Sequence, residues 1–265
     1  MRLVIHHETI YRYAEPARHT TQLLRLTPRR EGRQSVVRWH IRTPGRCVEQ
    51  VDAHGNVTHL LTLEEPHRQL AIVVDGEVEI TDQPELPNEG ALQPLAYLAP
   101  TRLTTADDAI RAIAARTLGN RPVTRASLHA LAEVVHATVR YTPGVTGVEE
   151  TATDALARGE GVCQDHAHVF LACCRAAGVP ARYVSGYFFA ADGVDIASHA
   201  WVDAWLASDG CWRSVDITHL RPAGTAHCRL AVGRDYLDAA PVRGVRSGGG
   251  GESMTVRVQI ALAGQ

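Results

Sequence analysis

Apolar and polar residues alternate along the first third of the chain. From Leu3 to about Thr81 the period is two, as in the opening run Leu3-Val-Ile-His-His-Glu, and turn formers such as Pro44-Gly45 and His54-Gly55-Asn56 divide the segment into about six short runs. Alternation of this kind is typical of strands with one buried face. We therefore predict a β-rich N-terminal domain over residues 1–90, folded as an antiparallel β-sandwich.

The pattern changes after a segment rich in proline and turn formers, which runs from Gln83 to Pro100 and marks a domain boundary. Beyond it the apolar residues recur with a helical period. Thr105 and Thr124 are predicted to cap two helices, and a short third helix is expected over Thr153–Leu156. The second domain is predicted to span residues 100–265.

The stretch from Gly161 to Gly178 predicts a deeply packed helix. Its apolar stripe is made of small or flat residues at helical spacing, namely Cys163, Ala167, Phe170, Cys174 and Ala177. Cys163 stands at the start of this helix, where unpaired backbone N–H groups and the helix dipole favour a thiolate. Cys163 is therefore a candidate nucleophile, and the alternative is a buried structural cysteine.

Strands are predicted after the helix, over residues 181–189, 198–206 and 212–217. On the second of these, His199, Trp201 and Asp203 share one face, and the parity of Asp216 on the next strand places it on the same face. A two-residue turn at Asp209-Gly210 would separate positions 199 and 216 by about 13 Å along the ladder, at about 3.3 Å per residue. Asp216 can then reach His199 only through a bulge or a longer loop, and Asp203 is the alternative partner.

Composition narrows the class of protein. The chain has 265 residues, 45% of them hydrophobic, a formal net charge of −2 and a pI near 6.7, so no bulk field favours nucleic acid or a membrane. All 27 basic residues are arginine, which excludes lysine chemistry. The six cysteines show no disulfide spacing, and neither a signal peptide nor a membrane span is evident. We expect a cytoplasmic protein that binds neither nucleic acid nor membrane.

Metal and cofactor sites find little support. Cys163, His166, His168 and His199 could supply zinc ligands, but positions 166 and 168 lie about 200° apart around a helix. No aspartate-rich calcium loop is present. The glycines at 248–251 precede a predicted strand at 254–260, whereas a phosphate loop precedes a helix. We expect no metal and no cofactor, and Asp165 and His168 are predicted to be helix-surface or supporting residues.

Several linked motifs occur in one order along the chain: Gly161-Val-Cys-Gln-Asp-His, Gly178-Val-Pro-Ala-Arg-Tyr, Ser198-His-Ala-Trp-Val, Val215-Asp-Ile-Thr218 and Val232-Gly-Arg-Asp-Tyr236. In these motifs the sequence resembles the transglutaminase-like superfamily. The opening segment, Met1–Arg30, resembles the β-rich N-terminal region of its bacterial members. The resemblance implies an α+β fold in which a papain-like core packs the cysteine helix on an antiparallel sheet.

The resemblance also implies thiol-dependent acyl transfer at an amide bond. Cys163 would attack, His199 would take and return the proton, and Asp216 would orient His199. The backbone N–H of Cys163 is a natural oxyanion donor and Gln164 is a candidate second donor, with Asp165 and Trp201 as supporting residues.

Three functions follow from this resemblance. The leading prediction is hydrolysis of a peptide or protein substrate, the second is transfer of a glutamine acyl group to an amine, and the third is an inert scaffold. The family usually has an aromatic residue at the position of His166 and proline at that of Ile217. These differences predict a changed pocket wall beside Cys163 and a changed loop after Asp216.

Overall fold

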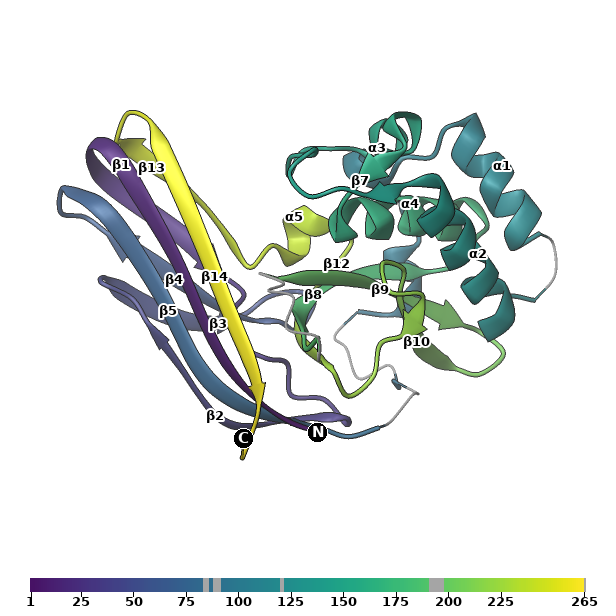
Figure 1. Ribbon diagram of the computed structural model, residues 1–265, viewed down its shortest axis with the longest axis horizontal. Helices are drawn as coiled ribbons and strands as arrows, with labels where there is room; N and C mark the ends of the chain where they lie inside the picture. Colours follow the sequence, from purple (N-terminus) through teal and green to yellow (C-terminus); the bar gives the residue numbers. More distant parts are fainter. Residues whose placement is uncertain (83–85, 88–91, 120–121, 191–197, 265) are drawn as a thin grey trace.

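The computed structural model describes residues 1–82, 86–87, 92–119, 122–190 and 198–264. A long curled sheet forms one side of the molecule, and a second sheet covered by helices forms the other (Figure 1). The two halves share a hydrophobic core, because Tyr187, Cys228 and Leu230 of the second sheet pack among the apolar side chains of the first.

The first sheet is antiparallel and has seven strands, in the order β2-β5-β1-β4-β3, with β13 and β14 also paired to β1. Its strands are β1 (Arg2–Leu24), β2 (Gln34–Arg42), β3 (Arg46–Val51), β4 (Val57–Leu63), β5 (His67–Ile80), β13 (Val242–Gly248) and β14 (Glu252–Leu262). Every second residue in the first half of β1 is buried, as the alternating sequence predicts.

The long strand β1 bends because its ladder is interrupted between Arg12 and Ala17, where the register with β5 shifts. Pro16 falls in this interruption and has no N–H to give to a ladder. The segment before it pairs with β5 and β14, and the segment after it pairs with β4 and β13. One strand therefore holds four neighbours, and the sheet curls around the bend.

The strands thus form one curled sheet, and the sandwich expected from the sequence is corrected in this respect. The inner face of the sheet is covered by the second half of the chain, so it needs no second sheet of its own. The division into residues 1–90 and 100–265 stays a prediction, but β13 and β14 show that the C-terminal segment completes the N-terminal sheet.

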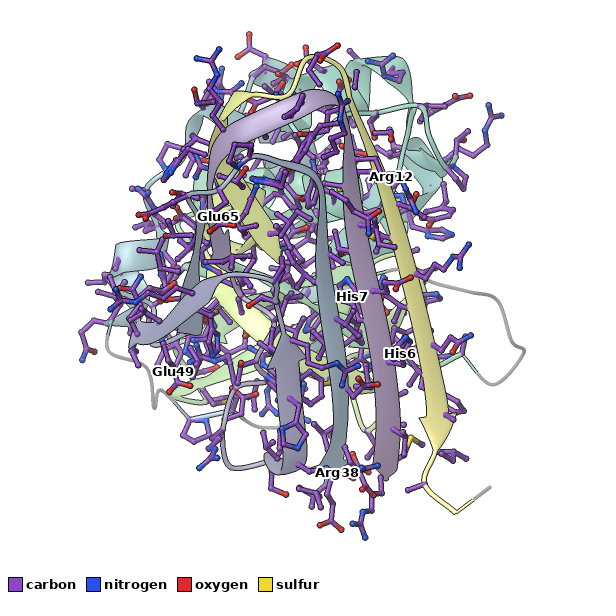
Figure 2. The ribbon with its side chains drawn as sticks, turned by 90° about the vertical axis from the view of Figure 1, so that its left-hand side faces the viewer. His6, His7, Arg12, Arg38, Glu49 and Glu65 are labelled. Atoms are coloured by element: carbon purple, nitrogen blue, oxygen red, sulfur yellow. The ribbon has the colours of Figure 1, made fainter. Side chains whose placement is uncertain are left out.

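The outer face of the sheet is polar. Figure 2 looks onto this side, where β14, β1 and β5 run next to one another and His6 lies on β1. His6 pairs with Asp75 at 2.7 Å, and Arg38 pairs with Glu77 at 3.3 Å. Cross-strand pairs of polar side chains such as these suit a face of the sheet that is exposed to solvent.

The second sheet is also antiparallel and has the order β11-β10-β9-β8-β12. Its strands are β8 (Ala181–Phe188), β9 (His199–Leu206), β10 (Cys211–Asp216), β11 (Arg221–Pro222) and β12 (His227–Gly233), and a separate parallel pair is formed by β6 (Arg140–Tyr141) and β7 (Glu160–Gly161). The helices are α1 (Asp108–Thr117), α2 (Arg125–Thr138), α3 (Ala152–Arg158), α4 (Cys163–Ala176) and α5 (Tyr236–Ala239), with 3-10 turns η1 (Pro94–Tyr97) and η2 (Arg102–Thr104).

Helix α4 lies between the second sheet and the helices α1, α2 and α3 (Figure 1). The apolar face of β9, formed by Ala200, Val202, Ala204 and Leu206, packs in the same cluster as the predicted stripe of α4. This confirms the predicted fold class, in which the cysteine helix packs on an antiparallel sheet. The predicted cap Thr124 is confirmed for α2, whereas α1 is capped by Asp107 instead of Thr105.

Among the described residues, no helix is both long and apolar enough to cross a bilayer. The location of the protein in the cell stays a prediction.

Candidate active site

Cys163 is the first residue of α4 and is partly exposed. The turn before it is fixed by Asp165, whose Oδ2 accepts hydrogen bonds from the backbone N–H of Val162 and from Oγ1 of Thr146, both at 2.7 Å. A Cβ atom on Gly161 would lie 2.6 Å from the Cβ of Asp165, so this approach requires glycine. The thiol is thereby held beside the N–H groups at the start of the helix.

His199 joins the thiol to the carboxylate. Its Nε2–H donates to Oδ2 of Asp216 at 2.9 Å, which leaves Nδ1 for its hydrogen bond with Cys163. Burial would lower the pKa of His199, but the hydrogen bonds to Asp216 and Cys163 outweigh it and raise the pKa to about 10. The structure therefore brings the three predicted residues together, with the imidazole in the middle.

The length of the β9–β10 loop explains how Asp216 reaches His199. Cys211 pairs with Leu206, so four residues form the loop where a two-residue turn was considered. This shifts the register by two positions and sets Val215 opposite Val202, so that Asp216 follows at the end of β10. The longer loop reduces the offset between His199 and Asp216 from four positions to two, and the two side chains span the remainder with their 2.9 Å hydrogen bond.

Asp203, the alternative partner, is used elsewhere. It accepts hydrogen bonds from Arg182 at 2.9 Å, from Ser214 at 2.6 Å and from Arg229. Burial would raise the pKa of Asp203, but the two guanidinium groups hold it well below its usual range. Asp203 therefore serves a buried ion cluster, and the geometry favours Asp216 as the partner of His199.

Two histidines that the sequence analysis did not single out also bind Asp216. His219 Nδ1 lies 2.7 Å and His227 Nε2 lies 2.9 Å from the same Oδ2, and the backbone N–H of His219 donates to Oδ1. The three rings converge from β9, from the loop after β10 and from β12. The only available signal was that His219 follows Asp216 by three residues, the spacing of a turn that closes on a side chain.

The tautomer of His227 is fixed by its neighbours. Its Nδ1 accepts a hydrogen bond from the backbone N–H of Gly224 at 3.1 Å, so Nε2 carries the proton and donates to Asp216. Burial lowers the pKa of His227 to about 4, against the opposing effect of Asp216. His227 is thus a neutral donor, while His199 carries the positive charge of the pair.

The remaining predicted residues lie around the trio Cys163, His199 and Asp216. The Gln164 amide donates to the carbonyl of Gly147 at 3.4 Å, and its side chain stands at the start of α4. Trp201 is fully buried and packs its ring 5.9 Å from that of His199. Its indole Nε1 is buried and has no hydrogen-bond partner among the described residues. Asp165 and His168 are both fully buried, so the helix-surface alternative predicted for them is wrong and the alternative of supporting residues stays.

His166 connects the two positions at which the chain departs from the family pattern. Its Nε2 donates to the carbonyl of Val139 at 2.7 Å, and its Nδ1 accepts from Oγ1 of Thr218 at 3.0 Å. Thr218 directly follows Ile217, which is buried in the core. His166 therefore ties the nucleophile helix to the loop after Asp216 through polar contacts that an apolar aromatic residue cannot make.

The zinc set considered from the sequence does not form, because His166 and His168 bind Thr218 and the backbone of Tyr236 respectively. In the part of the chain that the structure describes, the group with metal-ligand spacing is His199, Asp216 and His227, whose ligand atoms lie within 4.8 Å of one another. Their hydrogen bonds account for this convergence, because each Nε2–H has a carboxylate oxygen to bind.

Comparisons with known proteins agree with this architecture. Residues 3–79 match the model of the bacterial transglutaminase-like N-terminal region, and residues 111–217 match that of the transglutaminase-like superfamily. The chain is 33% identical to an uncharacterized protein of Mycobacterium leprae over 98% of both chains. It is 32% identical to one of Mycobacterium bovis over 90% of this chain and 85% of the relative.

Among solved structures, a putative cysteine protease from Cytophaga hutchinsonii superposes with a TM-score of 0.81 at 25% identity. The match covers 100% of this chain and 91% of that one. It extends over both halves of the molecule, including the curled N-terminal sheet. The chain therefore belongs to the transglutaminase-like superfamily, whose members and neighbours indicate thiol-dependent acyl transfer.

Proposed function

We propose that the chain is a cysteine-dependent amidase or peptidase that uses Cys163, His199 and Asp216. The observation that carries this proposal is the position of the His199 ring, which binds a partly exposed thiol on one side and a buried carboxylate on the other. A nucleophile, a base and an orienting group in contact are the elements that acyl transfer requires.

The geometry assigns a role to each atom. The Cys163 sulfur attacks the carbonyl carbon of an amide, and the His199 imidazolium gives its Nδ1 proton to the departing amine. This leaves a thioester and a neutral imidazole, which then takes a proton from the attacking water, so that a carboxylic acid is released and the Cys163 thiolate and the His199 imidazolium are restored. Asp216 keeps Nε2 protonated throughout and so holds Nδ1 toward the sulfur.

Charge on the tetrahedral intermediate needs hydrogen-bond donors. The backbone N–H of Cys163, in the first turn of α4, points out of the helix end and is available to a developing oxyanion. Gln164 is the candidate second donor, because its amide makes only a long contact with Gly147. Rotation of this amide would exchange that contact for the oxyanion.

Two alternatives are separated by the fate of the acyl group. The purified protein would be incubated with a mixture of peptides in water enriched in oxygen-18, with and without a fluorescent primary amine. Hydrolysis predicts heavy oxygen in new carboxylates, transamidation predicts incorporation of the amine, and Cys163→Ala should abolish either product. Amine incorporation without heavy oxygen in new carboxylates would show that the protein transfers the acyl group to an amine and does not hydrolyse the amide.

The inert-scaffold alternative is tested by thiol reactivity. Cys47 is exposed on β3 of the first sheet and serves as an internal reference within the same molecule. We expect iodoacetamide to modify Cys163 faster than Cys47 at neutral pH, and His199→Gln to remove this advantage. Equal rates in the wild-type protein would contradict the proposed function, whatever substrate is used.

A further inference from the structure

A cavity of about 420 Å³ lies between the C-terminal strands and the loop that precedes α3. Its walls include residues 242–246 of β13, Met254 of β14, Tyr236 and Leu237 of α5, and Val148 and Glu149 of the loop. Figure 1 shows β13 and β14 on the curled sheet and α5 beside the second sheet, so the cavity lies at the junction of the two halves.

The segments that line this cavity also contact the first turns of α4. Thr146 binds Asp165, Gly147 binds Gln164, and the backbone of Tyr236 binds His168. The phenol of Tyr236 is near enough to Cys163 for the thiol to add to the effect of burial in raising the pKa of Tyr236. The cavity is therefore walled by the same two segments that bind the first turns of α4, the helix that begins at Cys163.

The lining suits an extended chain. All five residues from 242 to 246 line the cavity, although neighbouring residues of a strand point to opposite faces, so the cavity runs along the edge of β13. This strand pairs with β1, and no second strand partner of β13 occurs in the described residues. Val148, Val245 and Met254 leave 51%, 71% and 57% of their surface exposed at the rim. A peptide strand could pair with this edge and cover these side chains.

The charges of the lining leave one cation without an acidic partner. Arg246 pairs with Glu252 at 2.9 Å, and Glu149 pairs with an arginine outside the cavity. Arg243 is exposed and gives one hydrogen bond to the carbonyl of Leu237 at 3.2 Å. Over the ranges of the chain that the structure covers, no carboxylate lies within ion-pair distance of its guanidinium, which can bind a carboxylate through two parallel N–H groups.

We propose that this cavity is the substrate channel and that Arg243 selects extended peptides carrying a carboxylate near the scissile amide. The inference rests on the proposed function for its chemistry, since it names the substrate class of the same thiol. The carboxylate belongs either to a glutamate or aspartate side chain or to a free C-terminus. Both present the same group to Arg243.

The test measures binding without turnover, in the full-length Cys163→Ala protein. Fluorescent, C-terminally amidated peptides that differ only in a central Glu, Gln or Lys would be titrated at low ionic strength by fluorescence anisotropy. A Gln peptide with a free C-terminal carboxylate forms the fourth arm and separates the two sources. We expect the carboxylate peptides to bind about two- to fivefold tighter than the amidated Gln peptide.

Substitutions at Arg243 decide the outcome. Arg243→Gln should abolish the preference, and Arg243→Glu should reverse it in favour of the Lys peptide. Arg257→Gln is the matched control, because Arg257 is an exposed arginine of β14 outside the cavity lining. Equal binding of all four peptides, or the same loss with Arg257→Gln, would overturn the inference. Failure of the proposed function would instead appear as absent turnover or an unreactive Cys163 while the peptide preference persists.

Discussion

The protonation of His199 depends on Asp216, and this dependence predicts how stability changes with pH. Asp216→Asn removes the carboxylate charge and retains the size of the side chain. In the wild-type protein the pKa of His199 is raised to about 10 because Asp216 and Cys163 overcome the effect of burial. Without the carboxylate we expect the pKa to fall toward or below the ordinary value of about 6.5.

Linkage gives the sign and size of the effect. The folded-state pKa lies above the unfolded one, so the imidazolium stabilises the fold fully below about pH 6.5, and this contribution is lost as the pH rises toward 10. The interval of 10 minus 6.5 is 3.5 pKa units, about 5 kcal/mol at about 1.36 kcal/mol per unit, and Cys163 supplies part of it. Between about pH 6.5 and pH 9 the pH rises by about 2.5 units, so about 3 kcal/mol of this stabilisation is lost by pH 9.

Urea unfolding of the wild-type protein and of Asp216→Asn at pH 6 and pH 9 measures this difference. We expect the free-energy gap between the two proteins to be about 2–3 kcal/mol larger at pH 6. The other histidines are common to both proteins, so most of their contribution cancels. The same comparison in a Cys163→Ala background should keep most of the effect, because the carboxylate remains the strongest partner. A gap that is equal at both pH values would refute the assignment of Asp216 as the counterion.

Three further predictions address the surroundings of the trio. His227→Leu removes one N–H donor from the buried carboxylate of Asp216. It should cost about 1.5–3 kcal/mol in urea unfolding and slow peptide hydrolysis, and His227→Gln should recover part of both. A full rate in the Leu variant would show that Asp216 needs no such donor. Gly161→Ala forces a Cβ against Asp165 and should cost about 1–3 kcal/mol while slowing alkylation of the nucleophile, whereas an unchanged alkylation rate would separate the turn from the thiol. Asp203→Asn leaves two buried arginines short of a counter-charge and should cost about 3–5 kcal/mol in thermal or urea unfolding. The folded fraction of the Asn variant should keep the wild-type pH profile of alkylation, and an altered profile would make Asp203 the partner of His199.

The sequence predicted the nucleophile helix and the faces of β9 because both depend on short-range periodicity. The start of α4 follows from Gly161 and the stop from Gly178, and the parity of His199 along its strand is fixed by the pleat. Register is a different matter, since it depends on the loop. With four residues instead of two between β9 and β10, Asp216 lies two positions from the point opposite His199, whereas a two-residue turn would set it four positions away.

Long-range partners could not be predicted from periodicity. The final strand was expected, but an alternating pattern gives the buried face of a strand and not its neighbour, so its pairing with β1 was not foreseen. The buried polar residues Asp165 and His168 were misplaced for a related reason. A polar residue is assigned to the surface by default, whereas Asp165 binds Oγ1 of Thr146 and His168 binds the backbone N–H of Tyr236, in segments that only the tertiary structure brings near.

The proposed chemistry and the proposed selectivity come from different parts of the chain. Cys163, His199 and Asp216 all lie within the segment that matches the superfamily core, and helix α4 with two adjacent strands suffices to align them. The cavity is instead completed by Tyr11 on β1 and by β13 and β14, which both pair with that same strand. A core with the same trio but another curled sheet would keep the reaction and change the substrate. The N-terminal sheet therefore forms one wall of the proposed substrate channel, which β1 builds together with β13 and β14.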